Sequence, residues 1–300
     1  MIEYRYVPVG RGEGSWGYEL DRALARHFDP GARRGFHADV FASLEYAEPP
    51  GPGDAGICHS LAMPGEPHLT GLLKDGRPRA LRDAELAWLS KFDSIFTLSA
   101  YFRGILERHD VTNVKGVLKY PTPAVRRSRE ILPRVVVSQR FSPEKAPLLV
   151  LELAARMPDV AFTFTSPAPP SGILASWLEL AADNVAAKCF PRKRDYYEYL
   201  GASQCGFVAT LRDNFGVSGL DCLAAGRPYI APDLFAYREL VGDPECLYEP
   251  FSLHDMERAV RHALAVEGDV EPPWTREAAI AHLHRMLGAA DDLRAEPAPQ

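Results

Sequence analysis

Short apolar runs of strand length alternate with amphipathic runs of helix length along almost the whole chain. Ser94–Leu98, for example, is a bounded apolar run typical of a buried strand, whereas Leu81–Phe92 repeats apolar residues at helical spacing. Such alternation predicts an α/β protein with parallel sheets, doubly wound with helices on both faces. The other elements that we expect before residue 121 are strands at Ile2–Val9, Ala38–Tyr46, Ala55–His59 and Val114–Tyr120, and helices at Gly17–Phe28 and Tyr101–Arg108.

A polar segment with prolines at its start, Pro121–Glu130, interrupts this alternation and is the best candidate for a linker. Because 300 residues favour two domains, we expect an N-terminal domain at 1–125, a second domain at 130–270, a C-terminal helix at 274–290 and a tail at 294–300. The elements expected after the linker are strands at Arg134–Ser138, Val160–Thr165, Asn184–Phe190 and Gly206–Leu211 and one beginning at Tyr229, and helices at Lys145–Met157, Ile173–Ala182, Asp195–Ala202, Met256–Val266 and Trp274–Leu287.

Two aspartates eight positions apart, Asp213 and Asp221, bracket the start of a predicted helix that follows the strand at 206–211. Gly216 lets the backbone approach a ligand closely, and the N–H groups near Ser218 begin the helix, where an anionic phosphate is favoured. Asp221 lies off the apolar stripe of this helix, so we expect it to face a cleft and to accept hydrogen bonds from a diol. The alternative is an ordinary loop acid followed by a solvated helix acid.

Composition narrows the classes of function that remain. A net charge of −6 excludes a broad basic surface for nucleic acid and leaves Arg126–Arg129 as a local basic cluster, expected to be part of a solvated linker. Five scattered cysteines without a C-x-x-C pair indicate neither a zinc site nor a disulfide framework, and reduced thiols fit a cytoplasmic protein. The charged N-terminus and the absence of a long apolar stretch predict no signal peptide and no transmembrane anchor.

Four segments between residues 130 and 265 have the order and spacing of a known enzyme family. They are Val137–Lys145 with Arg140 five residues before Lys145, Asn184–Leu200, Asp213–Asp221, and Tyr237–Val241. On these segments the chain resembles the GT-B glycosyltransferases, in particular the retaining family 4, whose Glu-x7-Glu motif corresponds to the two aspartates. In the first half, the glycine-rich loop after the first strand and the serine-led helix Ser99–Leu106 are similar to the family in position.

The resemblance implies a GT-B fold, in which two Rossmann-like doubly wound domains face each other across a cleft and a C-terminal helix crosses back to the N-terminal domain. It also implies metal-independent transfer of a hexose, with retention, from a nucleoside-diphosphate sugar to an acceptor hydroxyl. UDP-glucose is the first expectation for the donor. No resident cofactor and no metal ligand are expected.

The resemblance assigns roles to individual residues of this chain. Arg140 and Lys145 would neutralise the donor diphosphate, Asp213 would contact the donor sugar, and Asp221 would bind the ribose hydroxyls. His59 would lie near the transferred sugar, the alternative being a half-buried structural histidine. The other residues expected to bind the donor are Gly12, Gly14, Phe215, Gly216, Val217, Ser218 and Glu239, with a helix-capping or solvated acid as the alternative for the last. Arg192 and Lys193 are expected in a solvated turn, with contact to the nucleotide as the alternative.

The chain departs from the family pattern at several positions. Aspartates replace both motif glutamates, and Gln139 and Ala146 stand where the family has glycines. These changes motivate a second hypothesis, a catalytically silent sugar-nucleotide-binding module or partner subunit. A nicotinamide-dependent enzyme is a third hypothesis, although the first glycine loop lacks the G-x-G-x-x-G spacing. The acceptor stays open between a small molecule, a glycan and a modified nucleic-acid base; a DNA acceptor would require binding that weakens steeply with salt.

Overall fold

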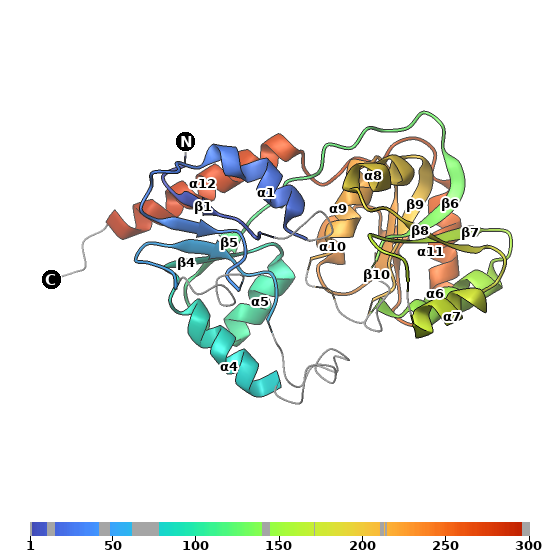
Figure 1. Cartoon of the computed structure of the whole chain (residues 1–300), viewed down its shortest axis with the longest axis horizontal. Helices are drawn as coiled ribbons and strands as arrows, with labels where there is room; N and C mark the ends of the chain where they lie inside the picture. The colour runs from blue at the N-terminus through green and yellow to red at the C-terminus, as the bar shows by residue number, and fades with distance from the viewer. Residues whose placement is uncertain are drawn as a thin grey trace. The chain divides into compact units, whose positions relative to one another are not determined.

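The computed structural model describes residues 2–10, 16–41, 49–61, 78–139, 145–170, 172–210, 213 and 215–295. The chain divides into two compact units (Figure 1). Unit 1 consists of Met1–Thr122 together with Trp274–Gln300, and unit 2 consists of Pro123–Pro273. Each unit is described by itself below.

Unit 1 is built on a parallel sheet of five strands in the order β1-β2-β3-β4-β5. In Figure 1 helices α1 and α12 cover one face of this sheet and α4 and α5 cover the other. Buried apolar side chains of α4, α5 and β4 form a core on the second of these faces. The elements are β1 (Arg5–Val7), α1 (Tyr18–Leu24), β2 (Gly35–His37), β3 (Ala55–Ile57), α4 (Pro78–Leu89), β4 (Ser94–Thr97), α5 (Ala100–Arg108), β5 (Val114–Val117) and α12 (Arg276–Ala295).

Over the described residues 38–41 the strand predicted at Ala38–Tyr46 is wrong, because the corresponding strand β2 ends at His37. The rest of the predicted range lies outside the described residues. The sequence of β2 is not a continuous apolar run, because one of its residues belongs to a buried polar pair. His37 Nε2 lies 3.0 Å from Asp54 Oδ2, and both side chains are almost fully buried. Since a buried carboxylate and imidazole satisfy one another, a polar residue can occupy an interior strand position there.

The C-terminal helix belongs to unit 1, as the resemblance implied. Trp274 Nε1 donates a hydrogen bond to the carbonyl oxygen of Tyr120 over 2.7 Å. His282 Nε2 lies 2.9 Å from the carbonyl oxygen of Val117, in β5. The buried side chains of α12 recur at every fourth position, which is the spacing of a single helical stripe facing the sheet; they are Ala279, Leu283 and Leu287.

Unit 2 is built on a parallel sheet of six strands in the order β11-β10-β9-β6-β7-β8. The chain first adds strands outward from β6 and then returns to place β9 on the other side of β6. This reversal is the topological switch point at which open α/β sheets bind ligands. The strands are β6 (Leu132–Val137), β7 (Ala161–Ser166), β8 (Val185–Cys189), β9 (Ser203–Phe207), β10 (Tyr229–Pro232) and β11 (Leu247–Tyr248), the last of which the sequence did not predict.

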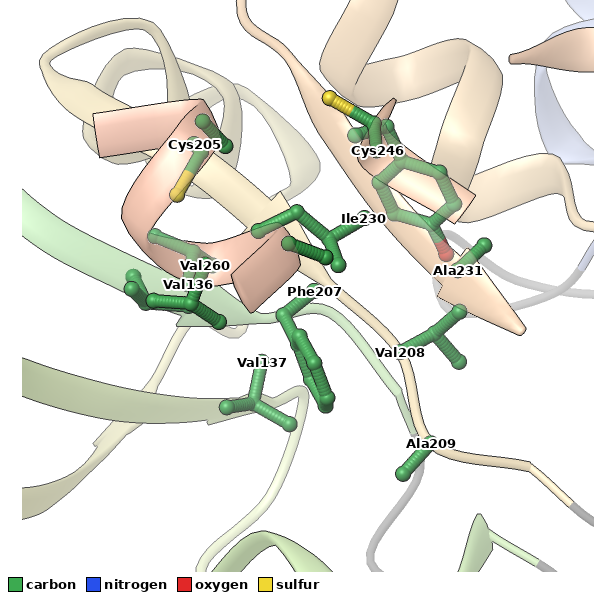
Figure 2. Packing of buried hydrophobic residues seen from close by; sticks show 14 of the residues in the cluster. Val136, Val137, Cys205, Phe207, Val208, Ala209, Ile230, Ala231, Cys246 and Val260 are labelled. Atoms are coloured by element: carbon green, nitrogen blue, oxygen red, sulfur yellow. The ribbon is translucent and has the colours of Figure 1, made fainter. Parts of the chain in front are cut away.

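Helices cover both faces of the unit 2 sheet: α6, α7 and α11 lie over one face, and α8 and α9 over the other (Figure 1). Figure 2 shows the interior, where Val136 and Val137 of β6 lie beside Phe207 of β9. A parallel strand buried on both faces carries a continuous apolar run, which explains the consecutive valines of β6. The helices are α6 (Pro147–Arg156), α7 (Ile173–Glu179), α8 (Lys193–Gly201), α9 (Val217–Ala224), α10 (Tyr237–Leu240) and α11 (Leu253–Ala265), with a 3-10 turn η3 (Pro244–Cys246).

Side-chain caps define several helix ends. The hydroxyl of Ser252 accepts a hydrogen bond from the N–H of Asp255 and so caps α11. Ser99 caps α5 in the same way. Asn184 donates to three carbonyl groups at the C-terminal end of α6, those of Ala154, Met157 and Val160. Asn184 of the family-like segment therefore stabilises the end of a helix in this chain.

A fully buried arginine joins three segments of unit 2. Arg227 is 1% exposed and donates hydrogen bonds to the carbonyl oxygens of Gly201 and Ser128, each over 3.1 Å. Its third nitrogen lies 3.5 Å from a carboxylate oxygen of Asp269. One guanidinium therefore ties the linker segment to the end of α8 and to the loop after α11.

We expect Arg227→Met to lower the free energy of unfolding by about 3 kcal/mol, because two buried carbonyl groups lose their donor and Asp269 loses a counter-charge. The measurement is calorimetric unfolding of the whole chain. Arg129→Met, at an exposed position near the start of unit 2, is the control and should change stability by less than about 0.5 kcal/mol. Equal effects of the two substitutions would contradict this role for Arg227.

Candidate functional site

A glutamine joins the two sides of the switch point in unit 2. Gln139 follows β6, and its side chain is mostly buried. Its amide nitrogen donates to the carbonyl oxygen of Lys145 over 2.7 Å, and its amide oxygen accepts from the N–H of Ala209 over 3.0 Å. The segments that leave the carboxyl ends of β6 and β9 are therefore held against each other at the place where a ligand is expected.

Lys145 and Asp213 meet at this end of the sheet. The ammonium of Lys145 lies 2.9 Å from Asp213 Oδ2 and 3.2 Å from the hydroxyl of Thr210. The hydroxyl of Tyr237 donates to the same carboxylate oxygen over 2.8 Å. The structure thus brings together two residues that were predicted as site residues from motifs 68 positions apart.

The other oxygen of the Asp213 carboxylate holds the turn that precedes helix α9. Asp213 Oδ1 accepts hydrogen bonds from the N–H groups of Phe215 and Gly216, over 3.2 and 3.0 Å. Gly216 has φ +83°, and a Cβ atom there would lie 2.6 Å from the ring of Tyr237. Glycine is therefore needed at this position both for its backbone conformation and for the close approach of the tyrosine that reaches Asp213.

The carboxylate of Asp213 is held in its ionised form. Burial raises its pKa, but the charge of Lys145 and the hydrogen bonds from Lys145 and Tyr237 outweigh burial and hold the pKa below its usual range. Ala146, next to Lys145, has φ +42°, a left-handed conformation that costs a residue other than glycine about 1–2 kcal/mol. The backbone that presents Lys145 is thus strained where the resembling family has a glycine.

We expected Asp221 of α9 to face a cleft, and it does not. It is 2% exposed, and its carboxylate lies 3.0 Å from the ammonium of Lys193 and accepts from the hydroxyl of Tyr197 over 3.3 Å. The prediction failed because α8 packs against α9 and covers the side of the helix that lies outside its apolar stripe. Lys193 was assigned to a solvated turn, and this was wrong as well: its ammonium neutralises a buried acid and lies 5.4 Å from the ring centroids of Tyr196 and Tyr197.

The remaining predicted donor-binding residues have different positions. Ser218 is the second residue of α9, and its hydroxyl lies 2.9 Å from the hydroxyl of Tyr229. Val217 is the half-buried first residue of α9, and Glu239 is exposed on α10. Arg140, Gly12 and Gly14 lie outside the described residues.

His59 follows β3 in unit 1. Its Nδ1 lies 3.6 Å from a carboxylate oxygen of the buried Asp39, and its ring stacks on the indole of Trp16 at a centroid distance of 4.0 Å. His59 was predicted as a site residue from the sequence, whereas Asp39 and Trp16 were not. These three residues follow the carboxyl ends of β3, β2 and β1, so the parallel sheet gathers them at one edge.

One arginine of the basic cluster at the linker is paired with acidic side chains. Arg127 lies 3.1 Å from a carboxylate oxygen of Asp269 and 2.9 Å from one of Glu271. These acids come from the loop after α11 and neutralise the arginine. None of the helices in the described part of the chain combines the length and the apolar character that crossing a bilayer requires.

No family model and no curated protein matches the chain. Solved structures match it. A variant of S. aureus TarM in complex with Fondaparinux, alpha-GlcNAc-glycerol and UDP aligns with a TM-score of 0.61 and 14% identity over 88% of this chain and 52% of TarM. Sucrose-phosphate synthase from Thermosynechococcus elongatus aligns with a TM-score of 0.57 and 15% identity over 92% of this chain and 72% of that protein.

The pneumococcal O-GlcNAc transferase GtfA in complex with UDP and GlcNAc aligns with a TM-score of 0.56 and 12% identity, over 93% of this chain and 60% of GtfA. The fold is GT-B. Within the GT-B fold, unit 2 has the strand order 3-2-1-4-5-6 of a dinucleotide-binding domain. The chain spans about half the length of TarM.

The lowered pKa of Asp213 gives a pH test of the Lys145–Asp213 pair. An ionised Asp213 stabilises the fold above its unfolded pKa of about 3.9, and this stabilisation is lost as the pH falls through the lower folded value. We therefore expect Asp213→Asn to lower the melting temperature near neutral pH, with the difference from wild type shrinking as the pH falls below about 4.

The measurement is the melting temperature of wild type and of Asp213→Asn at a series of pH values from neutral to acidic. Asp183→Asn, which changes an exposed aspartate of unit 2, is the matched control and should follow the wild-type curve throughout. A difference that stays constant down to the lowest pH would show that the charge of Asp213 does not stabilise the site.

Proposed function

We propose that the chain is a retaining glycosyltransferase that moves a sugar from a nucleoside-diphosphate sugar to an acceptor hydroxyl without the help of a metal ion. One observation carries the proposal: Lys145 is fixed beside the N-terminus of α9, at the switch point of a sheet with dinucleotide-binding order. An ammonium group and a helix N-terminus together suit a diphosphate. The GT-B fold supports the reaction class.

The chemistry requires charge stabilisation more than a protein nucleophile. When the bond from sugar to diphosphate breaks, negative charge builds on the departing phosphate oxygens. Lys145 would neutralise this charge, together with Arg140 from the same connection and the first N–H groups of α9, which have no acceptor within the helix. The N–H groups of Phe215 and Gly216 are bound to Asp213 in this structure, so the phosphate would meet those of Val217 and Ser218.

We assign the two aspartates different tasks. Asp213 positions Lys145 and the start of α9, and it would contact the donor sugar only by exchanging one of its present hydrogen bonds. Asp221 is buried between α8 and α9, so it would hold Lys193 and the hydroxyl of Tyr197 in place and would not contact the donor directly.

The neighbours guide the choice of donor. TarM and GtfA were both crystallised with UDP, so UDP-sugars, UDP-glucose first, are the donors that we propose for this chain. A sugar or another small hydroxyl compound is the acceptor class that we favour. A polyanionic acceptor is less favoured because Arg127 is already neutralised by Asp269 and Glu271.

A second candidate function is a catalytically silent sugar-nucleotide-binding module or partner subunit. It is favoured by the ion pairs of Asp213 and Asp221, which each engage a lysine in place of a ligand. Incubation with UDP-glucose and GDP-mannose separates the two candidates. A ligand at a hundred times its Kd adds about 2.7 kcal/mol of stability, which thermal unfolding detects. Binding with release of UDP or GDP supports the enzyme, and binding without slow hydrolysis or transfer supports the silent module.

We expect Lys145→Ala to reduce kcat/KM for donor turnover by about 10²–10³-fold, the loss seen when one preorganised donor to a developing anion is removed. Arg140→Ala should act in the same direction. The measurement is the rate of nucleoside-diphosphate release. Lys188→Ala, which removes an exposed lysine from β8 of the same unit, should leave the rate unchanged. Near-wild-type turnover in both Lys145→Ala and Arg140→Ala would show that the site is misassigned.

A further inference from the structure

Three side chains that commonly bind metal ions lie together in unit 2 and share no residue with the candidate functional site. They are Asp243, Cys246 and His262, called here the Asp243 cluster, and their ligand atoms all lie within 4.8 Å of one another. Asp243 and Cys246 come from η3 and the residue before it, and His262 comes from α11. A carboxylate, a thiol and an imidazole in one place form a mixed ligand set that borderline-soft divalent metals favour.

The distances within the Asp243 cluster are close to those of a metal site. His262 Nε2 lies 2.7 Å from Asp243 Oδ2, and Cys246 Sγ lies 3.9 Å from the same oxygen. Around a tetrahedral zinc ion with bonds of about 2.0–2.3 Å, ligand atoms lie roughly 3.3–3.7 Å apart. An ion would therefore need only a small separation of the aspartate and the histidine and a small approach of the sulfur.

Contacts with the rest of unit 2 position each of the three candidate ligands. Asp243 Oδ1 accepts a hydrogen bond from the N–H of Glu245 over 3.0 Å, which directs Oδ2 toward the other two ligands. Cys246 belongs to the buried core and lies near Ile230 at one end of the cluster drawn in Figure 2. His262 is carried by a helix of 13 residues that packs on β9 and β10.

Charge and access also suit a cation. A neighbouring cation, Arg258, is neutralised by Glu245 at 2.8 Å and Asp255 at 2.6 Å. The side chains of Asp243 and His262 are 43% and 35% exposed, so an ion can enter and a water molecule can reach it. Without an ion, burial and the charge of Asp243 raise the pKa of Cys246 to about 12; a bound cation reverses that interaction and favours the thiolate.

We propose that Asp243, Cys246 and His262 bind one divalent transition-metal ion of the zinc class, with water as the fourth ligand. Binding breaks the hydrogen bond between Asp243 and His262, and the imidazole takes the tautomer with its proton on Nδ1, which frees Nε2 to bind the metal. The thiol proton passes to solvent as the metal–sulfur bond forms. The ion joins η3 to α11 and so stabilises the last strand of the unit 2 sheet. The inference goes beyond the proposed function and does not depend on it.

Titration of the full chain with Co²⁺ tests the proposal, because a thiolate ligand gives a charge-transfer band in the near ultraviolet and a tetrahedral site gives strong visible bands. We expect one equivalent to bind and the melting temperature to rise. Cys246→Ser should abolish the charge-transfer band. Asp243→Asn and His262→Gln should each weaken Co²⁺ binding by at least about tenfold, the lower end of the losses caused by changes around metal ligands.

Two matched controls separate this site from accidental binding. His254→Gln removes an exposed histidine from the same helix, and Cys189→Ser removes the exposed thiol; both should bind Co²⁺ as wild type does. Should Cys246→Ser fail to fold, as judged by circular dichroism without metal, Asp243→Asn and His262→Gln still decide the matter. The proposal is overturned if wild type shows no charge-transfer band, or if the band survives unchanged in all three cluster variants.

Discussion

The ion pair between Lys145 and Asp213 fixes three segments of unit 2 at the carboxyl end of its sheet. Lys145 comes from the connection after β6, Asp213 from the connection after β9, and Tyr237 of α10 completes the contact. Asp213 also fixes the turn before α9 through the N–H groups of Phe215 and Gly216. One carboxylate therefore sets both the position of a cation and the start of a helix, which are the two features that would hold a phosphate.

A second lysine–aspartate ion pair also involves helix α9. Asp221 of α9 binds Lys193, which begins α8. The two cations thus come from the connections after β6 and β8, and α9 carries or adjoins both anions. Asp221 is 2% exposed, and the ammonium of Lys193, 3.0 Å away, balances the charge of its buried carboxylate. The helix α9 is accordingly the element on which the geometry of the site rests.

The features that could be predicted from the sequence are those with local or periodic signals. The strand–helix alternation, the caps at Ser252 and Ser99 and the positions of Asp213 and Gly216 all follow from patterns within a few residues. Lys193 and Asp39 could not be found in this way. Lys193 pairs with an acid 28 positions later, and Asp39 with a histidine 20 positions later, so neither pairing leaves a local pattern. The burial of Asp221 was missed because it depends on the packing of α8.

The GT-B fold at 12–15% identity leaves the chemistry of the site to the residues themselves. The central claim is that Lys145 and the N-terminus of α9 bind the diphosphate of a nucleotide sugar. A crystal structure of the whole chain with UDP tests this most directly. The account predicts a phosphate oxygen within about 3 Å of the Lys145 ammonium and of an N–H group at the start of α9. UDP bound elsewhere in the chain, with Lys145 still in contact with Asp213 and Thr210, would contradict it.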